Sequence, residues 1–362
     1  MRVFVPSQGK DDDCKRGALP AGIPPFVPRF GLWKGHLQTI AGNYWLRPNF
    51  HLAAEAEVVE VDSADGSRVL CQCHWQPAEV RASRLTIVLL HGLEGSSDSR
   101  YIRGLTVLAW NAGMNVVRMN MRNCGGTEEL TPTLYHSGRS ADVGAVVDHF
   151  TRRYGLERMA LAGYSMGGNM VLKLAGEWSA RRPLTGVATV CPVIDLAPCS
   201  DALHQPVNRA YEFHFLRGLM RRMRRKAELF PGIYRLSDLG PIRSIREFDE
   251  KIVAPYCGFA GADDYYFRAA AARVIDQVAV PTMVLMAKDD PFIRLLPETR
   301  DRIRLNPRIE LVETDHGGHC AFLGRGKDVH WAEAAVIQYF DWVDRVSGPR
   351  GAQRSAGESG SG

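Results

Sequence analysis

Short runs of hydrophobic residues alternate along the chain with longer stretches in which hydrophobic positions recur every three or four residues. The first kind of run is typical of strands buried on both faces, and the second kind predicts amphipathic helices. Residues 57–61 and 68–75 predict an antiparallel hairpin with its turn at Asp65-Gly66. The later predicted strands cover residues 85–90, 115–121, 158–162, 186–190, 282–287 and 308–312. The predicted helices cover residues 100–112, 139–154, 167–178 and 329–346.

This order of elements predicts a fold class. An antiparallel pair followed by alternating strands and helices favours the α/β-hydrolase fold, with a mostly parallel central sheet flanked by helices. Residues 195–275 interrupt the alternation, because they are helical, basic and aromatic in patches. We therefore expect an α/β-hydrolase domain over residues 29–347, with a helical lid insert at about 195–275. Residues 1–28 and 348–362 are expected to form a flexible leader and tail.

A candidate nucleophile lies between a predicted strand and a predicted helix. Gly163-Tyr164-Ser165-Met166-Gly167 matches G-x-S-x-G, in which small residues allow a sharp turn that exposes the serine oxygen above the sheet. A serine hydroxyl needs a base to take its proton, and in this fold the acid and then the histidine follow the serine along the chain. Ser165 is therefore predicted to be the nucleophile.

Two neighbouring carboxylates compete for the role of the acid. Asp289 and Asp290 both follow the predicted strand 282–287. We favour Asp290, because it precedes Pro291, where the chain leaves the strand and can turn a carboxylate over the sheet. Asp289 stays the alternative, and it is otherwise expected to face solvent or a loop amide.

Two histidines follow the last predicted strand, in Asp315-His316-Gly317-Gly318-His319. We favour His319 as the base, because two glycines before it let the loop fold close to the serine, and a helix follows. His316 is then expected to cap or pack the loop.

Acyl transfer also requires hydrogen-bond donors for the oxyanion. The backbone N–H of Met166, directly after the nucleophile, is one expected donor. The loop after the strand 85–90 reads His91-Gly92-Leu93-Glu94-Gly95, and the N–H of Leu93 is the second expected donor. His91 is expected to bind the nearby loop backbone and not to act as a second base.

At these motifs the chain resembles the α/β-hydrolases that include the bacterial YheT-like and plant EMB8-like proteins, yeast medium-chain ester synthases/esterases and membrane-anchored animal lipases. The resemblance extends from about Pro28 to Val346. It implies esterase, lipase or acyltransferase activity on short or medium acyl chains, with Ser165, Asp290 and His319 as the catalytic residues. The motifs that carry it are Gly35-His36-Leu37-Gln38-Thr39, His91-Gly92-Leu93-Glu94-Gly95-Ser96, Arg122-Asn123-Cys124-Gly125-Gly126, residues 163–168, Asp289-Asp290-Pro291-Phe292 and Gly317-Gly318-His319.

Composition limits the classes of binding partner and the cellular compartment that we expect for this chain. The chain has 362 residues, of which 45% are hydrophobic and 23% charged, and a formal net charge of +5. Its arginines are dispersed, so we expect no nucleic acid partner. The 8 cysteines are scattered without a C-x-x-C pair, which suits a reducing compartment and predicts no metal site. The first residues contain no apolar signal region, and no apolar run is long enough to span a membrane, so a cytoplasmic location is expected.

One basic segment could contact a membrane or attract an anionic substrate. Residues 217–226 (RGLMRRMRRK) interleave arginines with Leu219, Met220 and Met223, so that a helix there would have a basic face and a methionine-rich face. We favour a solvated lid helix whose apolar face covers the pocket, and keep peripheral membrane contact as the alternative.

Together these features predict a serine hydrolase that cleaves short- or medium-chain carboxylic esters through an acyl-enzyme, without a cofactor. Transfer of the acyl group to an alcohol is one alternative, and a non-catalytic binding protein of the same fold is another. The sequence leaves the oligomeric state open.

Overall fold

The computed structural model describes residues 23–45, 55–63, 65–182, 184–235, 237, 240–326 and 329–347. At its centre, these residues form an eight-stranded sheet in the order β1-β2-β4-β3-β5-β6-β7-β8. The strands are β1 (Glu57–Asp62), β2 (Arg68–His74), β3 (Thr86–Leu90), β4 (Asn115–Met119), β5 (Met159–Tyr164), β6 (Gly186–Val190), β7 (Thr282–Ala287) and β8 (Ile309–Thr314).

The sheet is mostly parallel. β1 and β2 form the predicted antiparallel hairpin, and β2 also pairs antiparallel with β4. From β4 to β8 every neighbouring pair is parallel. All residues of β3, β5, β6 and β7 are buried, as their continuous apolar runs predict for strands covered on both faces.

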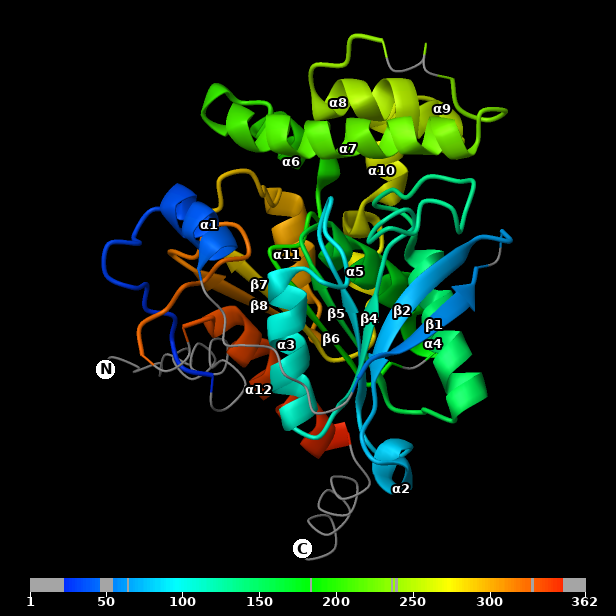
Figure 1. The fold of residues 1–362 in the computed structure, drawn as a ribbon. Coiled ribbons are helices and arrows are strands. Elements are labelled where there is room, and N and C mark those ends of the chain that lie inside the picture. Colours follow the sequence, from blue (N-terminus) through cyan, green and yellow to red (C-terminus); the bar gives the residue numbers. More distant parts are fainter. Residues whose placement is uncertain are drawn as a thin grey trace, which may run out of the picture.

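Helices cover both faces of the sheet (Figure 1). α3 (Arg100–Asn111) packs beside α12 (Trp331–Ser347), and α4 (Ser140–Tyr154) packs beside α5 (Met166–Trp178). Three shorter helices are α1 (Gly35–Tyr44), α2 (Ala78–Arg81) and α11 (Pro297–Leu305). The predicted mostly parallel sheet with flanking helices is therefore confirmed.

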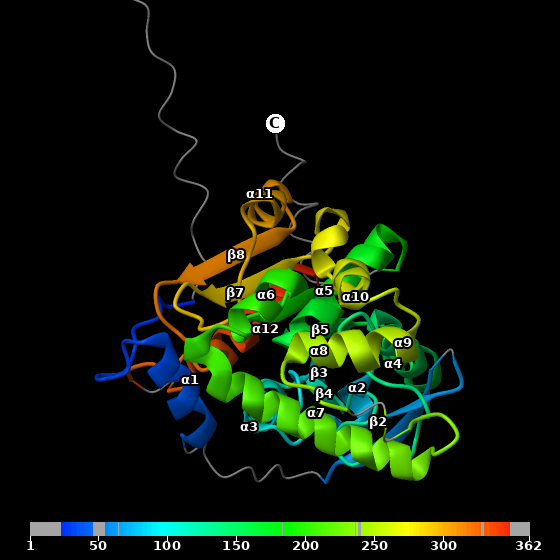
Figure 2. The same cartoon turned by 90° about the horizontal axis from the view of Figure 1, so that it is seen from above.

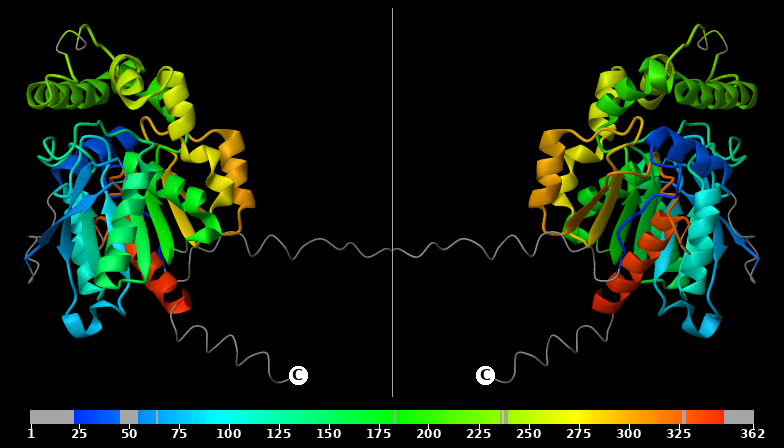
Figure 3. Two further views of the ribbon diagram at one scale, coloured as in Figure 1. Left: turned by 90° about the vertical axis from the view of Figure 1, so that its right-hand side faces the viewer. Right: turned by 90° about the vertical axis from the view of Figure 1, so that its left-hand side faces the viewer.

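A further helical layer stands above the ends of the parallel strands (Figures 1 and 3), and its helix α7 runs across the molecule when it is seen from above (Figure 2). All of these helices lie between β6 and β7 in the sequence. They are α6 (Leu196–Leu203), α7 (Arg209–Leu229), α8 (Ile245–Phe248), α9 (Ala254–Cys257) and α10 (Ala262–Ala269). The basic segment 217–226 is thus only the second half of a 21-residue helix.

The described chain begins inside the segment assigned to the leader. Ile23 is buried, and the Trp331 indole N–H donates to the Pro24 carbonyl over 2.9 Å. The Phe26 ring packs against Phe322 and Trp331 with centroid distances of 5.5 and 5.3 Å. Residues 23–28 therefore pack on the hydrolase core, while residues 1–22 and the tail 348–362 lie outside the described residues. Within the described residues, no helix has both the length and the apolar character needed to cross a membrane.

Candidate active site

Ser165 lies in a sharp turn between the last residue of β5 and the first residue of α5. Its φ is +53°, a left-handed conformation that costs free energy for a residue with a side chain. The flanking glycines make the turn possible. A Cβ atom at Gly163 would clash with the backbone of Gly167, and one at Gly167 would clash with the His91 carbonyl. The spacing of G-x-S-x-G therefore follows from steric crowding around the serine.

His319 and Asp290 approach Ser165 from two loops at the same edge of the sheet. His319 Nε2 lies 3.0 Å from Ser165 Oγ, and His319 Nδ1 lies 2.8 Å from Asp290 Oδ2. The other carboxylate oxygen of Asp290 accepts backbone N–H groups from Phe292 (3.1 Å) and Ile293 (3.0 Å). The turn after β7 thus orients the carboxylate toward the histidine.

The competing residues Asp289 and His316 lie on the other side of the same loops. Asp289 Oδ1 accepts the backbone N–H of Gly318 over 2.9 Å, so it binds a loop amide. His316 Nδ1 lies 3.5 Å from Asp289 Oδ2. The structure therefore brings Ser165, Asp290 and His319 together, whereas Asp289 binds the histidine loop through the Gly318 N–H.

The electrostatics of the pair favour a charged carboxylate beside a basic imidazole. Burial alone would lower the pKa of His319, but the Asp290 carboxylate and, to a lesser degree, Cys191 together outweigh burial and hold this pKa well above its usual range. Burial alone would raise the pKa of Asp290, but His319 and the two backbone N–H groups keep it below its ordinary value. Asp290 therefore stays ionised and makes His319 a stronger base.

The two predicted oxyanion donors belong to residues close to Ser165 at the cavity. Met166 is the first residue of α5, and the first N–H groups of a helix have no partner within the helix. Leu93 follows β3, and both residues line the same cavity as Ser165. The chain before Leu93 passes close to the serine, since a Cβ atom at Gly92 would lie 3.2 Å from the Ser165 Cβ.

His91 stabilises the loop that carries Leu93. Its Nε2 accepts the backbone N–H of Met121 over 3.1 Å, so Nδ1 carries the proton and donates to the Gly92 carbonyl over 2.8 Å. Burial lowers the pKa of His91 to about 4, which keeps the ring neutral. As the sequence predicts, His91 binds loop backbone.

Thr39 has a role that the sequence analysis did not assign. Its hydroxyl oxygen accepts the backbone N–H of His319 over 2.8 Å. The neighbouring Gln38 side chain accepts the backbone N–H of Leu323 and donates to the Leu323 carbonyl. Helix α1 therefore holds the histidine loop in place through these hydrogen bonds. The motif Gly35-His36-Leu37-Gln38-Thr39 marked this segment in the sequence, but it did not reveal the partner, because His319 lies 280 residues from Thr39.

An apolar cavity of about 130 Å³ opens at Ser165. Its floor comes from the sheet edge, with Leu93, Met166 and Val193, and its roof comes from the helices between β6 and β7. The roof residues are Leu196, Cys199, Ser200, Leu203, Phe215, Leu219, Arg222, Met223, Lys226, Ile245, Phe248, Asp249, Val253, Tyr265 and Tyr266. This lining fits the hydrocarbon part of a ligand next to the serine.

The orientation of α7 departs from the predicted separation into a basic and an apolar face. Leu219 and Met223 face the cavity as expected, but the cations Arg222 and Lys226 also turn inward. Arg222 Nε donates to Glu94 over 3.0 Å, and Lys226 Nζ donates to the Glu128 carbonyl over 3.0 Å. Inward cations are tolerated because each has a polar partner on the loops below α7.

Glu94 is a second position that the sequence analysis did not single out. Its side chain is 8% exposed, and its carboxylate accepts the Tyr135 hydroxyl over 2.7 Å and Arg222 Nε over 3.0 Å. Because Glu94 directly follows Leu93, this network links the roof of the cavity to the loop that carries the predicted oxyanion donor. In the sequence, Glu94 is marked only by being a charged residue inside a glycine-rich loop.

One group of described residues has the donor types for a metal ion. The ligand atoms of Cys191, His319 and Cys320 all lie within 4.8 Å of one another. Its third member, His319, is also the residue next to Ser165. The spacing of the cysteines in the sequence gave no sign of this group.

Comparisons with known proteins identify the family. A family model described as "alpha/beta hydrolase fold" matches residues 86–239. YheT, a predicted esterase of Escherichia coli (strain K12), is 32% identical over 325 residues, which are 88% of this chain and 92% of YheT. The chain belongs to the α/β-hydrolases related to YheT. The resemblance inferred from the sequence motifs is therefore confirmed.

Other relatives in this α/β-hydrolase family are eukaryotic. The embryogenesis-associated protein EMB8 of Picea glauca is 27% identical over 276 residues, which are 74% of this chain and 60% of EMB8. The phospholipase ABHD3 of Mus musculus is 32% identical over 243 residues, which are 67% of this chain and 59% of ABHD3.

Solved structures agree on the fold. An esterase of Pyrococcus furiosus superimposes with a TM-score of 0.55 at 16% identity, over 89% of this chain and 98% of that one. A 2,6-dihydroxy-pseudo-oxynicotine hydrolase gives a TM-score of 0.54 at 18% identity, over 85% of this chain and 71% of that one. The predicted α/β-hydrolase fold is confirmed.

Proposed function

We propose that this α/β-hydrolase cleaves short- or medium-chain carboxylic esters through an acyl-enzyme on Ser165. The observation that carries the proposal is the continuous hydrogen-bonded chain from Ser165 Oγ through His319 to Asp290, at the mouth of an apolar cavity. Relatives named as esterases and phospholipases support ester hydrolysis as the general activity.

In the proposed mechanism His319 acts as general base and then as general acid. Nε2 takes the proton of Ser165 as the oxygen attacks the ester carbonyl, and Asp290 stabilises the imidazolium that forms. The N–H groups of Leu93 and Met166 bind the oxyanion of the tetrahedral intermediate. The imidazolium protonates the leaving alcohol, and a water activated by the same histidine then releases the acid.

The roof of the cavity supports the preference for a hydrocarbon acyl chain. Leu219 and Met223 of α7 line the cavity together with Phe215 and Phe292, next to Ser165. We propose that the insert over about residues 195–275 acts as a lid that shields the acyl group from water. It would set the acyl length by the depth of the cavity that its helices leave open.

Acyl transfer to an alcohol is a second candidate, because a yeast relative is named "Medium-chain fatty acid ethyl ester synthase/esterase 2" and is 28% identical over 284 residues. The acyl-enzyme is the same in both reactions, and only the acceptor differs. Product analysis with and without added ethanol distinguishes them, since ethyl ester accumulates only if the alcohol competes with water.

The direct test is a panel of p-nitrophenyl esters from acetate to palmitate, hydrolysed by the wild type and by Ser165→Ala. We expect kcat to fall by at least about a thousandfold in the variant, because the nucleophile is lost. A fluorophosphonate probe should label the wild type and leave Ser165→Ala unlabelled. Equal turnover by both proteins would exclude Ser165 as nucleophile, and a folded wild type that resists the probe would favour a non-catalytic binding protein.

A further inference from the structure

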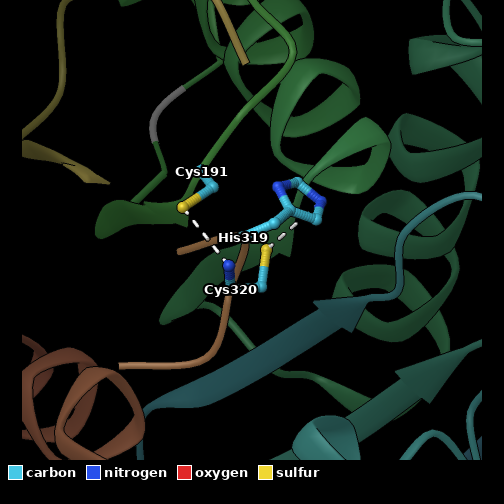
Figure 4. A group of neighbouring side chains, drawn as sticks. All are labelled: Cys191, His319 and Cys320. Atoms are coloured by element: carbon cyan, nitrogen blue, oxygen red, sulfur yellow. Dashed lines mark hydrogen bonds between the residues drawn. The ribbon is translucent and has the colours of Figure 1, made fainter. Parts of the chain in front are cut away.

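We propose that Cys191, His319 and Cys320 form a binding site for a thiophilic divalent cation such as Zn²⁺ or Cd²⁺, and that the bound ion blocks His319. The blocking effect rests on the proposed function of His319, whereas binding of the ion does not. Figure 4 shows the three side chains: Cys191 directly follows β6, and His319 and Cys320 lie in the loop after β8.

The donor atoms already have a spacing close to that of a metal site. Cys320 Sγ lies 3.7 Å from His319 Nε2, and all three ligand atoms lie within 4.8 Å of one another. Tetrahedral zinc with bonds of about 2.0 Å to nitrogen and 2.3 Å to sulfur needs roughly 3.6 Å between these two atoms. One edge of the site therefore has the required length, and the other two need a contraction of at most about 1.2 Å.

Asp290 prepares His319 for metal binding as well as for catalysis. Histidines that bind metals usually donate their other ring N–H to a carboxylate, which fixes the tautomer and raises the basicity of the ligand nitrogen. Here Nδ1 binds Asp290 over 2.8 Å, so Nε2 is the ring nitrogen that faces Ser165 and would bind a metal. The same hydrogen bond thus serves both functions.

The backbone holds both cysteines toward the histidine. Cys191 has a φ of +47° and Cys320 a φ of +59°, conformations that side-chain-bearing residues seldom adopt. Cys320 N–H donates to Cys191 Sγ over 3.4 Å, which ties the two loops together (Figure 4). Strain of this kind persists only where the surrounding structure enforces it, so the donor geometry is preorganised.

The cluster adjoins the cavity through Ser165. Cys320 and His319 are partly exposed, and Ser165, whose Oγ is 3.0 Å from His319 Nε2, lines the cavity. The serine hydroxyl or a water in its place supplies the fourth ligand of a tetrahedral ion.

Binding forms one metal–nitrogen and two metal–sulfur bonds, releases the two thiol protons and the Nε2 proton of charged His319 to water, and displaces waters from the ion. It also breaks the hydrogen bond between His319 and Ser165. Because the Nε2 lone pair is then occupied, the histidine cannot accept the serine proton. Removal of the ion by a chelator restores the free base, so the inhibition is reversible.

The test is a titration with Cd²⁺ in a phosphine reductant, followed by the ultraviolet charge-transfer absorbance of cadmium thiolates. We expect one saturable ion in the wild type and in Ser165→Ala, since serine chemistry is not needed. Cys320→Ala and Cys191→Ala should each weaken binding at least about tenfold. Cys257→Ala, which removes a partly exposed thiol of α9 outside the cluster, is the matched control and should bind Cd²⁺ as the wild type does.

A second measurement follows p-nitrophenyl butyrate hydrolysis with increasing Zn²⁺. Half-inhibition should require at least about tenfold more Zn²⁺ in Cys320→Ala than in the wild type, and chelation should restore activity. Thermal unfolding shows which variants are folded. If one cysteine variant is unfolded, Cd²⁺ binding by the other cysteine variant and by His319→Ala tests the site.

Unchanged Cd²⁺ binding in the folded variants would overturn the site. Cadmium binding without zinc inhibition of an active wild type would overturn the blocking effect alone. A wild type without esterase activity would count against the proposed function, while the cadmium titration would still decide the metal site.

Discussion

At the scale of single residues, two neighbouring aspartates have different environments. Asp290 is buried and lies against His319, while Asp289 binds the backbone N–H of Gly318. Both follow the same strand, and no rule of spacing distinguishes them. The turn at Pro291 distinguishes them, because the backbone N–H groups of Phe292 and Ile293 bind the Asp290 carboxylate and orient it toward the imidazole of His319.

This difference predicts the effects of two matched substitutions. Asp290→Asn should lower kcat by roughly 10⁴-fold, because the neutral amide no longer stabilises the imidazolium. Since Asp290 raises the pKa of His319 and the base must be neutral, the acid limb of the kcat/KM profile should move to lower pH in this variant. Residual activity of Asp290→Asn against pH measures both effects.

Asp289→Asn is the control for that experiment. It keeps an oxygen that can accept the Gly318 N–H, so kcat should fall by less than about tenfold and the pH profile should stay in place. The reverse pattern, with the large loss in Asp289→Asn, would assign the acid to Asp289.

At the scale of elements, one buried arginine joins three segments at the carboxyl end of β4. Arg122, in the loop after β4, donates from Nε to Asp142 in the first turn of α4 over 2.6 Å. It also donates from Nη1 to Asp65 in the turn of the β1–β2 hairpin over 2.6 Å. Only 1% of the Arg122 side chain and 2% of the Asp142 side chain are exposed. The loop motif Arg122-Asn123-Cys124-Gly125-Gly126 thus begins with a structural anchor.

Arg122→Met should therefore destabilise the protein strongly. The free energy of unfolding is expected to fall by about 3–5 kcal/mol, because Asp142 would stay buried without its partner. Arg68→Met is a matched control, since Arg68 pairs with Glu60 on the surface, where both side chains are more than 40% exposed. Its loss should be about 1 kcal/mol or less. Urea denaturation of both variants measures the difference, and equal small losses would contradict the anchoring role.

At the scale of the whole molecule, the cavity exists only where the helical layer meets the sheet edge. Met223, of which 1% is exposed, reaches into the cavity from α7. The exposed arginines 217, 221, 224 and 225 point away from it. Contact of these arginines with an anionic membrane stays a prediction, as does a cytoplasmic location.

Met223→Trp should shorten the acyl chains that the enzyme accepts. The larger ring would occupy cavity volume, so the ratio of kcat/KM for octanoate to that for acetate should fall by roughly tenfold or more. Met220→Trp is the control, since Met220 lies on the same helix but lines a different surface hollow. The p-nitrophenyl ester panel measures the ratio. An unchanged ratio in Met223→Trp would show that the acyl chain does not lie under α7.

The sequence by itself determined the features that depend on residues close together in the chain. Continuous apolar runs predicted the buried strands, and glycines on either side of Ser165 predicted its turn, because periodicity and steric crowding act over a few residues. The tertiary structure decided the features that depend on distant partners. It placed Asp290 rather than Asp289 against His319, turned Arg222 and Lys226 inward, and brought Cys191 beside Cys320, 129 residues away. Which groups meet there depends on how the loops pack at the sheet edge, and no local pattern encodes that packing.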